Sequence, residues 1–201
     1  MKIAVYFVAS FFLGAIPNAY AAGRLLKNID IRQYGSGNVG ATNAFRVLGK
    51  GPGSLVFTLD FLKGAIPVLL FTYFFPRTED PELMRLVAGL FAVLGHLFTP
   101  FLNFKGGKGI ATGGGAVCAA FPLLFLVTLG AWFLTFFVSR IVSLSSLVAV
   151  CVLAVYGVLT TQSSTLKGVF FAVVLLIFWT HRGNITRLIR GEENRFSKTT
   201  K

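Results

Sequence analysis

Residues 110–138 read IATGGGAVCAAFPLLFLVTLGAWFLTFFV, an apolar run with Pro122 near its middle. The run is longer than the roughly 20 residues that one helix needs to cross a bilayer. Proline removes a helical hydrogen bond and clashes with the preceding turn, so it divides the run into two shorter apolar pieces. Whether the run crosses once, crosses twice, or enters the bilayer and returns decides on which side of the membrane the rest of the chain lies.

The composition is that of an integral membrane protein. Of the 201 residues 55% are hydrophobic, and the mean hydropathy is +0.75. Lys and Arg outnumber Asp and Glu by 19 to 7, and they lie beside apolar stretches. This pattern favours anionic lipid or an anionic substrate over nucleic acid as the partner of the cations. Cys118 and Cys151 lie in apolar stretches, so we expect neither a disulfide nor a metal site.

Five more apolar stretches are expected to be membrane segments: Ile3–Ala22, Ser54–Phe75, Leu83–Phe101, Ser143–Thr160 and Lys167–Thr180. The first also resembles a secretory signal, because Ala19-Tyr20-Ala21 has the form of a cleavage site. We favour an uncleaved helix, since the stretch is long enough to span and the rest of the chain is membranous.

The positive-inside rule orients these segments. Loop 23–53 contains several Lys and Arg residues and Asp30 as its one acid, so we expect it in the cytoplasm and the N-terminus outside. If the run 110–138 crosses once, Arg140 and the basic tail are exported; if it crosses twice or returns, they stay inside. The second choice obeys the rule. We therefore predict an all-α integral membrane protein, a single domain over residues 1–201, with about seven transmembrane segments, some short, and a cytoplasmic C-terminus.

Three polar clusters interrupt the apolar chain: GSGNVGATNAFR at 35–46, NFKGGKG at 103–109 and HRGNITRLIRGEE at 181–193. In the predicted topology all three face the cytoplasm, where they could form one site. The alternative is that they are solvated loops. Their glycines favour a site, because glycine allows sharp turns and a close approach of backbone to ligand.

The first cluster contains GxGxxG, but no strand and helix of a soluble dinucleotide-binding domain surround it. Its amides could still form an anion-binding concavity, to which Arg46 adds a fork suited to phosphate. In the second cluster Lys105 and Lys108 flank two glycines at the start of an apolar helix. For Gly109 and Gly113 we expect close helix packing.

The two histidines, and the charged residues Asp60 and Lys63, need separate interpretations. His181 opens the third cluster, as a structural residue or as a catalytic base, whereas His96 is expected to be a core or interfacial residue. Asp60 and Lys63 lie one turn apart in an apolar segment, where a charge needs a partner. They either pair with each other, or Asp60 orients a cation of the site.

These motifs, in this order, resemble those of the bacterial acyl-phosphate:glycerol-3-phosphate acyltransferase family, often called PlsY. The matching stretches are GSGNVGATNAFR, the pair Asp60 and Lys63, FKGGKG, and the pattern HRxNIxRLxxGxE. The resemblance implies a multi-pass protein of the bacterial inner membrane with a cytoplasmic active site. It would move a fatty acyl group from acyl phosphate to the sn-1 hydroxyl of glycerol 3-phosphate, giving lysophosphatidic acid and phosphate. It also supports the uncleaved first helix.

The residues and the resemblance together give a candidate site without a cofactor. Its expected partners are acyl phosphate, glycerol 3-phosphate, membrane lipid and a soluble acyl-phosphate synthase. The expected catalytic residues are His181, Ser36, Arg46, Lys105 and Asn184. The expected phosphate-binding residues are Ser36, Gly37, Asn38, Gly40, Thr42, Asn43, Arg46, Lys105, Gly106, Gly107, Lys108, Gly109, His181, Arg182 and Asn184, with Asp60 and Glu193 as possible orienting carboxylates.

Several alternatives stay open from the sequence. Gly183 stands where the family pattern leads us to expect a larger residue, and Glu192 replaces a neutral one, so either Glu192 or Glu193 could be the acting carboxylate. The proton of the attacking hydroxyl could go to His181 or to the acyl phosphate itself. Ser36 could instead be an acylated nucleophile. From other classes, the chain could be a transporter or channel for an organic phosphate, although we see no internal repeat, or a non-catalytic scaffold.

Overall fold

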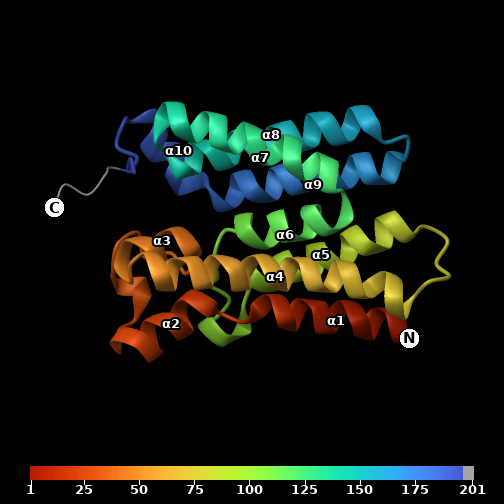
Figure 1. Cartoon of the computed structure of the whole chain (residues 1–201), viewed down its shortest axis with the longest axis horizontal. Coiled ribbons are helices and arrows are strands. Elements are labelled where there is room, and N and C mark those ends of the chain that lie inside the picture. The colour runs from red at the N-terminus through yellow and green to blue at the C-terminus, as the bar shows by residue number, and fades with distance from the viewer. Residues whose placement is uncertain (197–201) are drawn as a thin grey trace. The chain divides into compact units, whose positions relative to one another are not determined.

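The computed structural model describes residues 1–196, and its regular structure is helical. The chain divides into two compact units, which meet in sequence between Phe121 and Pro122. Both are seen in Figure 1. The first unit contains α1 (Lys2–Ala15), α2 (Asn18–Lys27), η1 (Ile31–Gln33), α3 (Ala41–Val47), α4 (Lys50–Phe74), α5 (Pro81–Leu97), η2 (Pro100–Leu102) and α6 (Ile110–Ala120). The second contains α7 (Pro122–Ser139), α8 (Val142–Thr160), α9 (Ser164–Thr180) and α10 (Arg182–Ile189).

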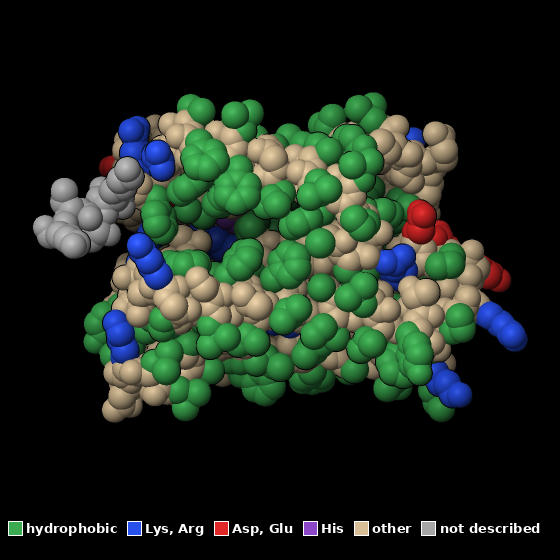
Figure 2. Space-filling view, viewed as in Figure 1, with side chains coloured by type: hydrophobic (Ala, Val, Ile, Leu, Met, Phe, Trp, Pro, Cys, Tyr) green, Lys and Arg blue, Asp and Glu red, His purple; other side chains and the backbone are tan. Residues whose placement is uncertain are grey.

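Five helical stretches are long and apolar enough to cross a membrane: Lys2–Lys27, Lys50–Phe74, Pro81–Leu102, Pro122–Ser139 and Val142–Thr160. A sixth is possible if α9 and α10, which meet at a bend of 65°, act as one span. Hydrophobic side chains cover most of the face of each unit shown in Figure 2, and most charged side chains lie near helix ends. The all-helical membrane class is confirmed, and five or six helical stretches are long enough to span; the count of about seven segments, some short, stays a prediction.

The expected break in the run 110–138 is confirmed. Helix α6 ends at Ala120, and α7 begins with Pro122 as its first residue. Proline is well tolerated at this position, because the first helical N–H groups have no partner in the helix anyway. With 11 residues α6 is roughly 16 Å long, shorter than the roughly 30 Å of a hydrocarbon core. Helix α6 is therefore too short to cross by itself.

The first segment is not the single helix expected over Ile3–Ala22. Helix α1 ends at Ala15, and α2 begins at Asn18 after Pro17, which has no N–H to donate. The break leaves carbonyl oxygens without helical donors, and side chains of other helices supply them. Thr99 Oγ1 donates to Ala15 O at 2.6 Å, and Lys63 Nζ donates to Ile16 O at 2.8 Å. The polar groups freed by the break are thus satisfied inside the unit.

Glycine allows α4 and α6 to cross with their backbones in contact. A Cβ atom added at Gly64 would overlap the carbonyl oxygen of Thr112, and one added at Gly115 would overlap that of Phe61. The expectation that Gly109 and Gly113 pack helices is wrong. A Cβ at Gly113 would meet only a Val93 methyl at 3.9 Å, and Gly109 instead begins α6 with a φ of 82°.

Gly64→Ala should destabilise the fold, because the new methyl group has no room at the crossing of α4 and α6. We expect a cost of about 1–3 kcal/mol, measured as a lower midpoint of thermal unfolding in detergent. Gly130→Ala in α7 is the matched control, since nothing lies within 4 Å of the added atom. Alanine there should be neutral or stabilise by about 0.5–1 kcal/mol, because helical glycine is entropically costly. Equal midpoints for the two variants would contradict this account of the crossing.

Candidate functional site

Asn43 organises the first polar cluster from inside. Its side chain is 1% exposed, and its Oδ1 accepts a hydrogen bond from the backbone N–H of Ser36 at 2.9 Å. Its Nδ2 donates to the carbonyl oxygens of Tyr34 and Ile31 at 3.0 and 3.3 Å. Gly35, with a φ of 62°, leaves room for this amide, which a Cβ would overlap. Asn43 and the Ser36 amide are therefore engaged within the loop itself, and they are poor candidates for direct phosphate contacts.

The other polar side chains of this cluster are not engaged in this way. Those of Ser36, Asn38 and Thr42 make no hydrogen bond to any residue in the described range. Gly37 completes a turn by donating its N–H to Tyr34 O at 3.0 Å, and Gly40 precedes α3. Of the neutral donors expected from the sequence, the three side chains are thus the ones that can turn toward a ligand.

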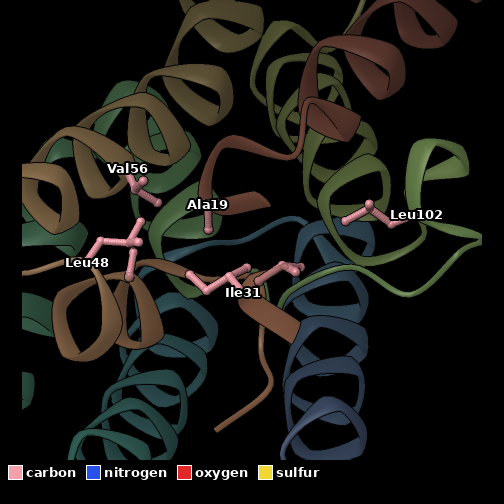
Figure 3. Packing of buried hydrophobic residues seen from close by; sticks show 7 residues of the cluster. Ala19, Ile31, Leu48, Val56 and Leu102 are labelled. Carbon is pink, nitrogen blue, oxygen red and sulfur yellow. The ribbon is translucent and has the colours of Figure 1, made fainter. Parts of the chain in front are cut away.

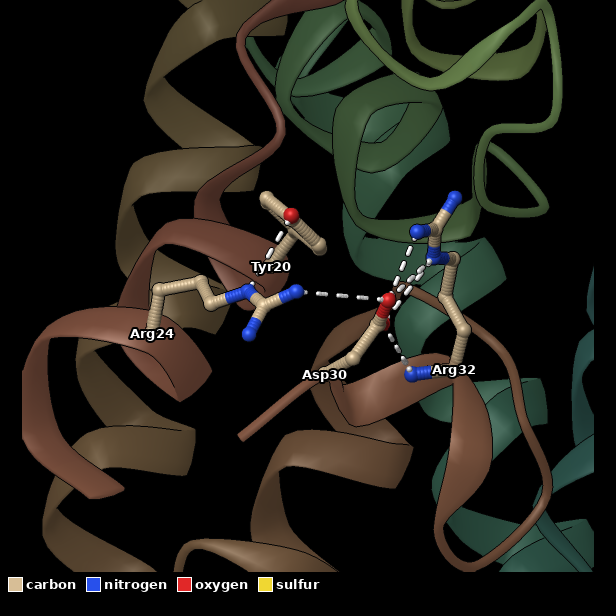
Figure 4. Close-up of polar contacts among 4 residues, drawn as sticks. All are labelled: Tyr20, Arg24, Asp30 and Arg32. Carbon is tan, nitrogen blue, oxygen red and sulfur yellow. Dashed lines mark hydrogen bonds and ion pairs between the residues drawn. The ribbon is translucent and has the colours of Figure 1, made fainter. Parts of the chain in front are cut away.

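Two arginines of the basic loop are held by an acid and an aromatic ring (Figure 4). Arg32 donates to Asp30 at 2.6 and 2.9 Å, and Arg24 lies 3.7 Å from the same carboxylate. The guanidinium groups of both arginines lie about 5 Å from the centre of the Tyr20 ring. The hydrogen bonds from Arg32 hold the pKa of Asp30 at about 2. These cations are neutralised locally, so they are weak candidates for binding a substrate.

Arg46 and Lys105 are different, because their charges have no partner within residues 1–196. Neither side chain makes a hydrogen bond or an ion pair with a described residue, and both are exposed. Even Lys27 of the same loop donates to a carbonyl oxygen, that of Val47, at 2.8 Å. Unpaired cations beside an apolar protein surface attract anions. Of the predicted cationic residues in the first unit, Arg46 and Lys105 therefore fit phosphate binding best.

The second cluster is fastened to the end of α5. Gly106 N–H donates to Leu97 O at 2.9 Å, and Gly107 N–H donates to His96 O at 3.1 Å. These two amides are thus used within the protein. The loop instead presents the side chain of Lys105, and it ends at Gly109, where α6 begins. The side chain of Lys108 also interacts within the described chain.

One buried hydrophobic cluster supports both loops of the first unit. It contains Ile31 and Val39 from the first loop, Ala44 and Leu48 from α3 and its end, and Leu102 just before Lys105, together with Ala19 and Val56. Figure 3 shows these side chains in one region of the unit. Helix α3, which carries Arg46, and the loop that carries Lys105 therefore pack around the same buried cluster.

His181 lies at the bend between α9 and α10 in the second unit. Its side chain is 2% exposed, and its Nδ1 lies 2.9 Å from Ile177 O. Because a carbonyl oxygen can only accept, Nδ1 carries the proton in this contact, and Nε2 of the neutral ring has the lone pair. The bend thus fixes the tautomer that a general base would need. Arg182 beside it stacks on Trp179, with its guanidinium carbon 4.7 Å from the ring centre.

Glu193 is the centre of a hydrogen-bond network in the second unit. Its Oε1 accepts from Asn184 Nδ2 at 2.6 Å and from Ser143 Oγ at 2.9 Å, and its Oε2 accepts from Arg187 Nε at 2.7 Å. Glu192 is exposed. Of the two glutamates, Glu193 is thus the one that is hydrogen-bonded to Asn184, and its role as an orienting carboxylate stays a prediction. Ser143 was not singled out from the sequence, where its only signal is a serine at the start of an apolar helix.

Asp60 is paired with Lys63, as one of the two sequence interpretations held. Lys63 Nζ lies 2.8 Å from Asp60 Oδ1, and both side chains are almost fully buried. Asn18 Nδ2 donates to the same oxygen at 2.9 Å. His96 is a core residue, 7% exposed, as expected. Cys118 and Cys151 are free thiols, and no group of three potential metal ligands occurs within the described chain.

Comparisons with known proteins give one consistent result. The family model for glycerol-3-phosphate acyltransferase matches residues 4–191. A glycerol-3-phosphate acyltransferase of Staphylococcus haemolyticus (strain JCSC1435) is 44% identical over 198 residues, which cover 96% of this chain and 97% of the relative. One from Chlorobium phaeobacteroides (strain BS1) is 41% identical over 223 residues, which cover 95% of each chain.

Two solved structures are also similar to this chain. They are crystal structures of PlsY, an integral membrane glycerol 3-phosphate acyltransferase, in its glycerol 3-phosphate form and its lysophosphatidic acid form. The TM-scores are 0.90 and 0.87, with 37% sequence identity in both cases. The match covers 98% of this chain and 96% of each solved chain.

Acid should destabilise the second unit through Glu193. Burial acts to raise the pKa of this carboxyl, but hydrogen bonds from Asn184, Ser143 and Arg187 outweigh it, and the pKa is lower than usual. The unfolded chain therefore takes up the proton first, so the contribution of Glu193 to stability is complete above about pH 4.3 and is lost as the pH falls below that value.

The measurement is the midpoint of thermal unfolding in detergent from about pH 6 down to about pH 3.5, a window that contains the ordinary glutamate pKa. Glu193→Gln should be less stable than wild type near neutrality and should lose less on acidification. Glu192→Gln is the control, and it should follow wild type. Parallel curves for wild type and Glu193→Gln would contradict the assignment.

Proposed function

The chain belongs to the glycerol-3-phosphate acyltransferase family, and from this premise we propose that it transfers a fatty acyl group from acyl phosphate to the sn-1 hydroxyl of glycerol 3-phosphate. The products are lysophosphatidic acid and inorganic phosphate. The observation that carries the proposal is that Arg46 of α3 and Lys105 of the second glycine loop have no partner within residues 1–196 and lie on segments that share one buried cluster. Both substrates bear phosphate groups, and two such cations can neutralise them.

The proposed reaction needs no covalent enzyme intermediate. The hydroxyl oxygen of glycerol 3-phosphate attacks the acyl carbon, the bond between that carbon and the phosphate oxygen breaks, and phosphate leaves with the electron pair. Phosphate is a good leaving group when cations balance its charge. Arg46 supplies a two-pronged donor and Lys105 a point charge for this purpose. Ser36, Thr42 and Asn38 add neutral donors that are not engaged with the described chain.

His181 is the proposed acceptor of the hydroxyl proton. In its neutral ring Nδ1 donates to Ile177 O, so the lone pair is on Nε2. The leaving phosphate oxygen is the other acceptor, and in that case His181 orients the substrate. Asn184, held by Glu193, is the adjacent polar group proposed to bind a phosphoryl oxygen. Ser36 as an acylated nucleophile is less favoured, because no basic side chain in residues 1–196 is hydrogen-bonded to its hydroxyl.

The proposed site lies at the cytoplasmic face of the bacterial inner membrane. His181 and Asn184 of the third polar cluster are proposed to serve the same reaction as Arg46 and Lys105. The arrangement has seven membrane segments if α6 enters the bilayer as a short one and α9 with α10 forms the last. It gives the acyl chain access from lipid and glycerol 3-phosphate access from water. Acyl phosphate made by a soluble synthase would reach the same face.

A donor comparison tests the proposed reaction. Purified protein in detergent receives glycerol 3-phosphate with acyl phosphate, acyl-coenzyme A or acylated carrier protein, and lysophosphatidic acid is measured. We expect product with acyl phosphate and little with either thioester. Arg46→Ala and Lys105→Ala should each lower the rate by about tenfold or more, as for the loss of a preorganised charge contact. A transporter would form no product in detergent, and preference for a thioester would overturn the choice of donor.

Substitution of His181 distinguishes the two fates of the proton. His181→Ala should lower kcat by about a hundredfold or more, the scale of general acid–base catalysis. His181→Asn keeps a donor near Ile177 O and should retain more activity than alanine if the substrate takes the proton. If asparagine is as inactive as alanine, and if the wild-type limb of the pH profile near neutrality is lost, His181 is the base. Unfolding midpoints of both variants check that the fold is intact.

A further inference from the structure

A buried polar cluster in the first unit joins three helices to the break between α1 and α2. Asp60 and Lys63 are 1% and 4% exposed and form an ion pair within α4. Lys63 also donates to Ile16 O, and Asn18 donates to Asp60. The fourth member is His96 of α5, whose Nδ1 lies 3.8 Å from Asp60 Oδ1. An ion pair inside a membrane protein is costly unless it has such additional contacts.

The opposite edge of the His96 ring meets the second glycine loop. A Cβ atom added at Gly107 would overlap Nε2 of His96, so the ring occupies the place where a side chain at residue 107 would lie. The backbone of the same loop is hydrogen-bonded to the end of α5, from Gly107 N to His96 O at 3.1 Å and from Gly106 N to Leu97 O at 2.9 Å. His96 is thus the side chain on which this loop is seated.

The loop seated on His96 carries Lys105, which with Arg46 is one of the two predicted site cations of the first unit that have no partner within residues 1–196. Gly106 and Gly107 follow Lys105 directly, so a shift of the glycine pair moves the lysine backbone with it. The buried charges of Asp60 and Lys63 act on the ring of His96 from the other side. A displacement of a positioning group by about 1 Å can cost about a hundredfold in rate, so the seat matters for catalysis.

We propose that His96 is a positioning residue, which seats the Gly106-Gly107 backbone and so sets where the Lys105 ammonium meets a substrate phosphate. The inference rests on the proposed phosphate-binding role of Lys105. The competing explanation is that His96 only fills the core. A core residue would affect the stability of the fold, and it would leave the affinity of the folded protein for glycerol 3-phosphate unchanged.

Matched substitutions at the two glycines test the seat. In Gly107→Ala the new methyl group meets the end of the His96 side chain, so removal of that side chain in His96→Ala/Gly107→Ala should relieve the overlap. In Gly106→Ala the methyl group meets the backbone carbonyl of His96, which no side-chain change removes. The second substitution is therefore the control, because His96→Ala cannot rescue it.

The readouts are KM for glycerol 3-phosphate, kcat and the unfolding midpoint. We expect Gly107→Ala to raise KM by about tenfold to a hundredfold, the scale of a displaced positioning group. Adding His96→Ala to Gly107→Ala should reverse most of the rise in KM. Adding it to Gly106→Ala should reverse none of the rise. His96→Ala alone should raise KM, and His96→Gln should raise it less. An unchanged KM in His96→Ala, or a double variant no better than Gly107→Ala, would overturn the proposal.

A second measurement separates this inference from the proposed reaction. Glycerol 3-phosphate should raise the unfolding midpoint of wild type by stabilising the folded state. If wild type forms no product but shows this shift, the proposed reaction fails. The effect of His96→Ala on the two glycine variants can then still be measured as a recovery of the shift in unfolding midpoint. If wild type forms product and the rescue is missing from both readouts, only the positioning role of His96 fails.

Discussion

The carbonyl oxygen of Ile16, at the break where Pro17 follows α1, accepts hydrogen bonds from Asn18 N–H at 3.1 Å and from Lys63 Nζ at 2.8 Å. A buried ammonium group needs a charged partner, and Lys63 has one in Asp60, 2.8 Å away. Asn18, the first residue of α2, donates through its side chain to the same carboxylate oxygen. The two buried charges of α4 are thus tied to both sides of the break between α1 and α2.

The need of a charge for a partner also distinguishes the cations near the candidate site. In the basic loop Arg24 and Arg32 share Asp30 and the ring of Tyr20, so their charges are balanced within the protein. Arg46 and Lys105 have no such balance from the part of the chain that the structure describes. Exposed charges contribute little to the stability of a fold. Such cations can attract anions, and for the proposed substrates the anion is phosphate.

Local chemistry decided which parts of the fold could be predicted from the sequence. The break at Pro122 followed from the covalent structure of proline, and the pairing of Asp60 with Lys63 was one of two interpretations that helical spacing and the cost of a lone buried charge allowed. The break at Pro17 was not predicted, because the apolar residues around it have the composition of one continuous span, and nothing local shows that distant donors exist for the carbonyl oxygens beside it.

The site was less predictable than the fold, because its residues act through partners that are remote in sequence. Asn43 looked like a ligand donor, but its amide is enclosed by the backbone of residues 31–36. The network of Glu193 includes Ser143, which lies 50 residues away, so the choice between Glu192 and Glu193 needed coordinates. Likewise, whether a glycine packs two helices together depends on the helix opposite it. The glycines at the helix crossing are Gly64 and Gly115.

The proposed chemistry explains why so much of the structure holds backbone in place. An acyl phosphate is already activated, so the protein has to supply position and charge more than a nucleophile. The position of the charged side chains then depends on the backbone of the loops. In the first unit, one loop is held by the buried amide of Asn43, and the other by hydrogen bonds to the end of α5. Gly35 and Gly107 are places in these loops where a side chain, that of Asn43 or of His96, lies against the backbone. Arg46 and Lys105 can thus be exposed and unpaired within the described chain while the segments that carry them are fastened from inside.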